Sequence, residues 1–411
     1  MPERLTTLPG RSWPAGVRAL RHRQFRALWS GLLVSAIGTW MQIVAQSLLV
    51  LRLSHGSAFA LGCVSLAQAS AFFGFALVGG GLADRLDRRR LLMVTQTGLM
   101  LLAGTLGLLT TLGAVNVPII AAIAFVSGVI LSFDQPARAA LVATLVPEED
   151  LLNAISLQSA VFNTAAVAGP ALAGLIVNWM GLAADFFLNA LSFTGVLAAL
   201  MFLTSEPSLP RRREKLVTQI REALRSVRHD PVLLSALCAY GMLLFAGPSL
   251  QLLLPVLALN RLHVGPAILG FLFSAAGVGA VLGAIVLGSF RAPTIRMAGV
   301  ALACWCAALA IAGAGITVRV TFGALVLMGA SQSIVGSSTS ALLQTRVPAQ
   351  QRGRVMSLNT LLLMGVRPLG DFPAGALIAG IGAPLTAAVS AAVVAATGIF
   401  IYEKASRPAT R

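Results

Sequence analysis

The fold is decided by residues 80–90, GGLADRLDRRR, which separate two long apolar runs. Four arginines and two aspartates fall in these eleven residues, whereas only 11% of the whole chain is charged. The apolar runs on either side, 58–82 and 91–112, each exceed the roughly 20 residues that a helix needs to cross a bilayer. A short basic loop between two such helices is typical of a multi-pass membrane protein.

Ten further apolar runs of similar length give twelve expected membrane spans. They are continuous, whereas barrel strands would be about ten residues long and alternating. We therefore predict an all-α membrane protein. The spans are expected at 28–51, 58–82, 91–112, 118–141, 151–177, 183–203, 232–259, 267–288, 297–316, 320–343, 355–379 and 384–402.

The composition excludes several classes of protein. A soluble domain carries about 25% charged residues, far more than this chain, and 57% of the chain is hydrophobic. These values exclude a soluble enzyme, a disordered chain and a fibrous protein. The net charge of +16 would suit nucleic-acid binding, but the basic residues are dispersed over loops that flank the spans, so no nucleic-acid partner is expected.

The basic residues also predict the orientation. With the N-terminus in the cytoplasm, 26 Lys and Arg residues fall on the cytoplasmic side and three on the other. By the positive-inside rule both termini are cytoplasmic, and the expected location is a bacterial inner membrane. No cleavable signal peptide is expected.

A change in composition divides the chain into two halves. Pro207, Pro210 and three consecutive arginines follow the sixth span, and apolar residues then recur at helical spacing from Leu216 to Val227. This segment predicts an amphipathic helix on the membrane surface. The expected units are an N-tail (1–26), a first half (27–203), a central loop (204–231), a second half (232–402) and a C-tail (403–411).

The two halves repeat each other. At an offset of 208, Leu61-Gly62 matches Leu269-Gly270. At an offset of 201, Gly169 matches Gly370 and Ala173-Gly174 matches Ala374-Gly375. Parallel six-span halves predict a transporter fold with a substrate site at the midplane.

The basic loop resembles the loop signature of the major facilitator superfamily, G-x-L-A-D-R-x-G-R-R, with Asp87 in place of the second glycine. The resemblance implies a gating loop whose ion pairs break and re-form as the halves rock. An ordinary positive-inside loop is the alternative. The loop residues concerned are Gly80, Asp84, Arg85, Arg88 and Arg89.

The fifth span carries Gly169, Pro170 and Gly174, which resemble the antiporter signature of the same superfamily. That signature accompanies proton-coupled exporters, and the alternative is a packing face of small residues. Together with stretches such as residues 133–138, 189–193 and 352–357, these motifs resemble the branch that contains bacterial enterobactin (siderophore) exporters and macrolide exporters.

Two charges in the eleventh span depart from that branch. Arg367 and Asp371 stand where its members have small or polar residues, and residues 163–166 read Asn-Thr-Ala-Ala instead of Asn-x-Ala-Arg. Charges inside a span are costly unless they are paired or hydrated. Their spacing of four predicts a pair on one helix face, and either a proton and substrate switch or a structural ion pair fits.

Several other polar residues could have either a structural or a functional role. Asp134 and Arg138 are expected to form a gate pair or a helix-end pair, and Asp185 to lie at the membrane interface. The acids at 148–150 suit a helix N-terminus. By analogy with the family, spans 1, 4, 7 and 10 line the cavity. Its candidate residues, each of which could also be structural, are Trp40, Gln42, Gln46, Gln251 and Gln332.

The predicted function is export of small organic molecules, siderophore-like or drug-like, by proton-coupled alternating access in a monomer. A proton-coupled nutrient importer and a macrolide pump without a siderophore role stay open. A membrane-embedded enzyme and a sensor or scaffold are less well supported. Neither a catalytic residue nor a cofactor is expected, and the cysteines inside spans do not predict a metal site.

Overall fold

The computed structural model describes residues 14–83, 86–203, 224–225, 227–228, 230–290, 294–347, 355–356, 359, 362 and 366–406. These residues form helices and turns, without a strand. The first part of the chain contains η1 (Ala15–Arg21), α1 (Arg23–Leu53), α2 (Ala58–Ala83), α3 (Arg88–Thr111), α4 (Val117–Val142), α5 (Glu148–Met180) and α6 (Leu182–Met201). The second part contains α8 (Pro231–Ala246), α9 (Leu250–Leu257), η2 (Ala258–Leu262), α10 (Pro266–Gly288), α11 (Ile295–Ala314), α12 (Val318–Arg346), α14 (Arg367–Ile381) and α15 (Ala383–Ser406).

The helices have the lengths that a membrane requires. Within the described part of the chain, ten segments are long and apolar enough to cross a bilayer, and Ala383–Ile399 of α15 is a shorter apolar helix. The predicted all-α membrane fold is therefore confirmed. The eleventh predicted span, 355–379, corresponds in its second part to α14, while much of its first part lies outside the described residues. Leu216 and most of the expected amphipathic helix in the central loop also lie outside the described residues.

The predicted span over 232–259 is confirmed as Pro231–Leu262, although its helix is interrupted at residues 247–249. Pro248 has no N–H for a helical hydrogen bond, and the side chain of Ser249 caps the following helix by accepting from Leu252 N at 3.2 Å. A Cβ on Gly247 would lie 2.3 Å from the Trp305 ring, so glycine allows this close approach. The span therefore consists of α8, α9 and the π-helix η2.

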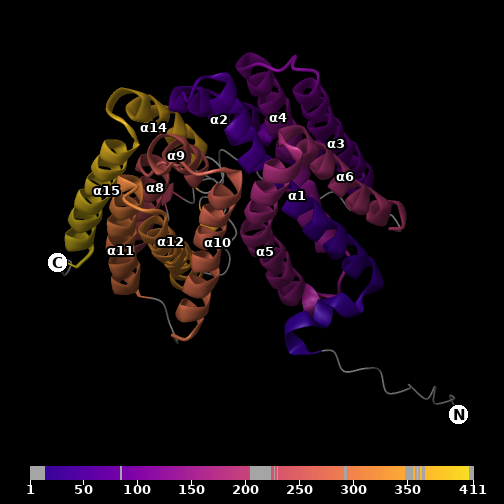
Figure 1. Cartoon of the computed structure of the whole chain (residues 1–411). Helices are drawn as coiled ribbons and strands as arrows, with labels where there is room; N and C mark the ends of the chain where they lie inside the picture. Colours follow the sequence, from indigo (N-terminus) through magenta and orange to yellow (C-terminus); the bar gives the residue numbers. More distant parts are fainter. Residues whose placement is uncertain are drawn as a thin grey trace, which may run out of the picture.

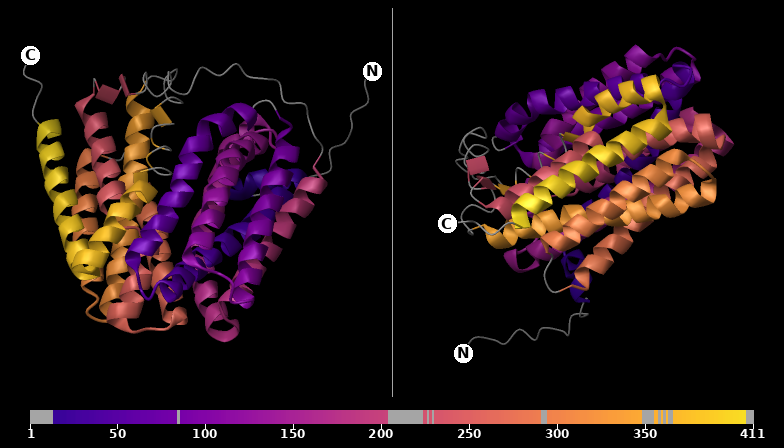
Figure 2. Two further views of the ribbon diagram at one scale, coloured as in Figure 1. Left: turned by 90° about the horizontal axis from the view of Figure 1, so that it is seen from above. Right: turned by 90° about the vertical axis from the view of Figure 1, so that its left-hand side faces the viewer.

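The helices form two bundles that lie side by side (Figure 1). In the first bundle, α1 packs on α5 and α6, and α2 packs on α4. In the second, α12 packs on α10 and α11, and α11 on α15. The bundles touch where α5 meets α10 and where α2 meets α14, and Figure 2 shows both groups of helices from two further directions.

Candidate functional site

The contact between α5 and α10 depends on the motif of the fifth span. A Cβ on Gly270 of α10 would lie 2.3 Å from the carbonyl oxygen of Pro170, and one on Gly174 would lie 2.5 Å from that of Pro266. Both distances are too short for any side chain. The glycines thus let the two backbones touch, as small residues do between membrane helices.

The contact between α2 and α14 is built in the same way. A Cβ on Gly62 would lie 3.1 Å from the carbonyl oxygen of Asp371, and one on Gly375 would lie 2.8 Å from that of Ala58. Gly62 is the repeat equivalent of Gly270, and Asp371 is the equivalent of Pro170. Equivalent residues therefore make equivalent contacts across the boundary, which is the pseudo-two-fold relation that the sequence repeat predicts.

The repeat also holds within each bundle. A Cβ on Gly169 of α5 would lie 2.5 Å from Cβ of Trp40 on α1. A Cβ on its equivalent, Gly370 of α14, would lie 2.0 Å from the carbonyl oxygen of Phe245 on α8. The first helix of each bundle is therefore packed against a glycine of its fifth.

These contacts between the bundles share one end of the molecule. We call the end that carries Arg23, Arg88 and Arg346 the basic end, and the end with the turns at Gly56 and Gly181 the opposite end. Gly62 and Pro266 lie in the first turns of helices that start at the opposite end, so these close approaches between bundles lie toward the opposite end.

Arg367 and Asp371 do not form the direct ion pair that their spacing predicts. The guanidinium Nη2 of Arg367 donates to Oε1 of Gln332 on α12 at 3.1 Å. The carboxylate of Asp371, which is 3% exposed, accepts from the backbone N–H of Ser249 at 2.9 Å. Neighbouring helices offer each side chain a partner nearer than the other charge, so Asp371 holds the start of α9.

The cavity candidates have separate surroundings. Gln42 accepts from Nδ2 of Asn189 on α6 at 2.6 Å. The Trp40 ring meets Phe162 edge to face, with centroids 5.6 Å apart. Gln332 holds Arg367, while Gln46 and Gln251 are half-buried. Among the described candidates, Gln332 is therefore the member of this set that binds a charged one, Arg367.

The loop motif is only partly described, because Asp84 and Arg85 lie outside the described residues. Gly80 belongs to α2. Arg88 donates to the carbonyl oxygen of Ala140 near the end of α4 at 3.4 Å. Arg89 donates to Leu200 and Met201 at the end of α6, at 2.6 and 2.8 Å. Both arginines satisfy helix C-terminal carbonyls inside the first bundle.

Asp134 and Arg138 form the predicted ion pair on α4. Asp134 is fully buried and also accepts from Thr95 Oγ1 at 2.8 Å and from Gln96 Nε2 at 2.7 Å, both on α3. The carboxylate thus joins α3 to α4 near the basic end.

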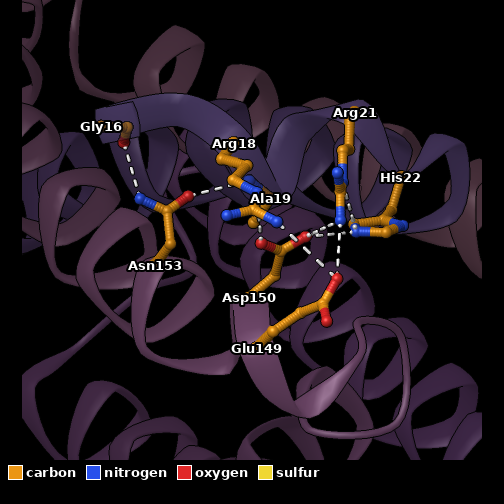
Figure 3. Close-up of polar contacts among 8 residues, drawn as sticks. All are labelled: Gly16, Arg18, Ala19, Arg21, His22, Glu149, Asp150 and Asn153. Carbon is orange, nitrogen blue, oxygen red and sulfur yellow. Dashed lines mark hydrogen bonds and ion pairs between the residues drawn. The ribbon is translucent and has the colours of Figure 1, made fainter. Parts of the chain in front are cut away.

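A polar cluster at the start of α5 was not predicted (Figure 3). Asp150 is 1% exposed, and its carboxylate lies 3.1 Å from Arg18 Nε, 3.0 Å from Arg21 Nη2 and 2.7 Å from His22 Nε2. Asn153 accepts from the N–H of Ala19 and donates to the carbonyl of Gly16. The acids therefore do more than match the helix dipole, because they bind η1 to α5. The basic residues of the N-tail were the feature of the sequence that could have predicted this contact with the acids of α5.

Asp185 lies in the first turn of α6, near the end of the sixth span as predicted, and its side chain is fully buried in the first bundle.

Comparison with known proteins agrees with this architecture. A family model described as transmembrane secretion effector (MFS_3) matches residues 15–410. The enterobactin exporter EntS of Citrobacter koseri is 28% identical over 393 residues, which cover 93% of this chain and 91% of that protein. The EntS protein of Escherichia coli O1:K1 is 26% identical over 390 residues, 92% of this chain and 90% of its own length.

Solved structures show the same fold at low sequence identity. A bacterial homologue of the iron transporter ferroportin, in an inward-facing state, has a TM-score of 0.72 and 18% identity, covering 94% of this chain and 99% of that one. A bacterial homologue of the lysosomal transporter Spinster, inward-facing and unoccupied, has a TM-score of 0.71 and 16% identity, covering 94% and 95%. The chain therefore belongs to the transmembrane secretion effector family of the major facilitator superfamily and is a transporter, not an enzyme.

Proposed function

We propose that this transporter exports a small organic molecule, siderophore-like or drug-like, in exchange for protons. The observation that carries the proposal is the similarity to enterobactin exporters over about nine-tenths of both chains. The fifth-span motif, with Pro170 and Gly174 seated against α10, supports the same direction of transport.

Alternating access follows from the contacts between the bundles. The positive-inside rule places the basic end in the cytoplasm, so the glycine contacts at Gly62 and Gly270 lie on the outer side. A carrier closed on the outer side is ready to load from the cytoplasm, as an exporter must. Rocking about the midplane would then separate these contacts and release the substrate outward.

Proton coupling is assigned to Asp371. Its buried carboxylate holds the N–H of Ser249, at the break where α9 begins. Protonation would remove the charge from this contact, and charge-assisted hydrogen bonds are roughly twice as strong as neutral ones. The start of α9 would then be freed to move. Arg367 donates to Gln332, which is neutral, so its positive charge can still bind an anionic group of the substrate.

The test of coupling is Asp371→Asn in proteoliposomes loaded with enterobactin. The amide oxygen can still accept from Ser249, so we expect a folded protein that exchanges substrate down its gradient but no longer responds to an imposed pH gradient. A response equal to that of the wild type would reject Asp371 as the coupling residue.

The substrate class is tested by deleting the gene and assaying the medium. Loss of secreted siderophore would support the siderophore-like class. Unchanged siderophore secretion together with greater macrolide sensitivity would reject it in favour of drug efflux. Reduced uptake of a nutrient would instead indicate an importer.

A further inference from the structure

Asp185 is a buried carboxylate without a hydrogen-bond partner in the described part of the chain. It lies in the first turn of α6, its side chain is 0% exposed, and neither carboxylate oxygen has a hydrogen-bond partner among the described residues. Buried polar groups are nearly always hydrogen-bonded, and an ionised carboxylate without a partner costs several kcal/mol in a protein interior. An acid kept in such a place requires an explanation.

The position of Asp185 on its helix directs it toward α1. Asn189 and Ser192 follow at spacings of four and seven, so the three residues share one face of α6. A Cβ on Gly38 of α1 would lie 2.6 Å from Oδ1 of Asn189 and 2.5 Å from Oγ of Ser192, so this face is in contact with α1. Asn189 is also bonded to Gln42 of α1. Asp185 therefore lies one turn beyond this polar contact, toward the opposite end.

Within the described residues, the helices that pack on α6 do not place a cation beside the carboxylate. On α1 the charged residues are Arg23, Arg26 and Arg52, and Arg52 is an exposed residue in the last turn. The charges of α3 are confined to residues 88–90 and those of α5 to residues 148–150, all at the basic end. The described residues also contain no group of three His, Cys, Asp or Glu side chains that could hold a metal ion.

We propose that Asp185 is a second proton-binding residue of the transport cycle, which holds its proton while α1 and α6 are packed together. The neutral acid fits the closed interface, whereas the ionised carboxylate needs water or a cation. Release of the proton therefore requires α1 to move away from α6. Since α1 also packs on α9 of the second bundle, its position is connected to the boundary that rocks. The transport role of Asp185 rests on the proposed function above.

The proton itself is measured by infrared spectroscopy of the full-length protein in membranes. Protonated carboxyl groups absorb separately from carboxylates, so the absorbance can be titrated with pH. In the Asp371→Asn background, which removes the carboxyl assigned to coupling above, we expect a protonated component that titrates with pH and is missing once Asp185→Asn is added. As a matched control, Asp230→Asn removes a carboxylate that is paired with Arg346 at the basic end and should leave this component in place. A protonated component that survives unchanged in the double variant Asp371→Asn and Asp185→Asn overturns the proposal.

Transport supplies the second readout. In Asp185→Asn proteoliposomes we expect the enterobactin flux driven by a pH gradient to fall at least about tenfold, equivalent to about 1.4 kcal/mol. The flux down a substrate gradient should persist. Driven flux equal to the wild type would overturn the role in transport. If the wild type itself ignores the pH gradient, proton coupling in the proposed function fails, and the infrared titration still decides whether Asp185 binds a proton. Correct insertion and folding are checked by a monodisperse elution profile of each variant.

Discussion

Asp134 and Asp185 are both buried acids, and they differ in their hydrogen-bond and ion-pair partners. Asp134 is bonded to Thr95, Gln96 and Arg138, whereas neither oxygen of Asp185 has a hydrogen-bond partner in the described part of the chain. A paired buried charge is costly to unpair, while an unpaired carboxyl favours its neutral form. The first is therefore expected to serve stability, and we assign the second to proton binding.

Replacing Asp134 by Asn should destabilise the protein by about 3 kcal/mol. This is the low end of the range for breaking a buried ion pair, because the Arg138 side chain is 29% exposed. The melting temperature of the purified variant measures the loss. Adding Arg138→Gln should restore part of it, since the unpaired charge is then gone. A single variant as stable as the wild type would contradict the assigned role.

Helix ends at the basic end are stabilised by arginines of the loop motif. Arg89 donates to two carbonyls at the end of α6, and Arg88 to one near the end of α4. The sequence predicted this loop and its charge. It did not predict these partners, because the loop does not specify which helix ends lie beside it.

Arg89→Ala should therefore cost about 1–2 kcal/mol of stability, the upper part of the range for a cation at a helix C-terminus, because Arg89 is partly buried and donates to two carbonyls. Arg90→Ala is the matched control, because Arg90 is a neighbouring exposed arginine, and it should change stability by less than about 0.5 kcal/mol. Thermal unfolding of both variants in the same detergent makes the comparison. Equal losses would indicate a general effect of loop charge instead of capping.

The N-terminal element depends on α5. Asn153 bonds both Ala19 N and the carbonyl of Gly16, and Asn153→Ala should expose residues 14–22 to limited proteolysis several-fold faster than in the wild type, with about 1 kcal/mol lost per hydrogen bond. Ser156→Ala one turn later is the control, since its hydroxyl donates to the carbonyl of Leu152 in its own helix. An unchanged cleavage rate in Asn153→Ala would contradict docking by this side chain.

At the scale of the whole molecule, close backbone contacts at glycines hold the two bundles together. The pairs Gly270 with Pro170 and Gly62 with Asp371 are related by the internal repeat, so closure at the opposite end is shared by two equivalent sites. Because both sites lie at one end, filling either one should oppose closure there and favour the alternative arrangement.

Gly270→Ala should shift the conformational equilibrium by about 1–3 kcal/mol, the usual cost of overpacking, toward separation at the opposite end. Spin labels at Leu112 and Ile316, which are exposed at that end in different bundles, should report longer distances. Gly288→Ala on the same helix is the control, because a Cβ there meets nothing within 4 Å. Distance distributions that match the wild type in both variants would show that this contact does not control closure.

The sequence by itself determined the helical membrane fold, the basic end, the internal repeat and the family. These properties depend on apolar length, on the placement of charge and on local motifs, which do not require knowledge of neighbours. The tertiary structure alone decided that Arg367 binds Gln332, that Asp371 binds Ser249, that Asp150 binds the N-terminal helix and that Asp185 is buried. A spacing of four brings two side chains to one helix face, but the partner that each takes depends on which other helices pack there.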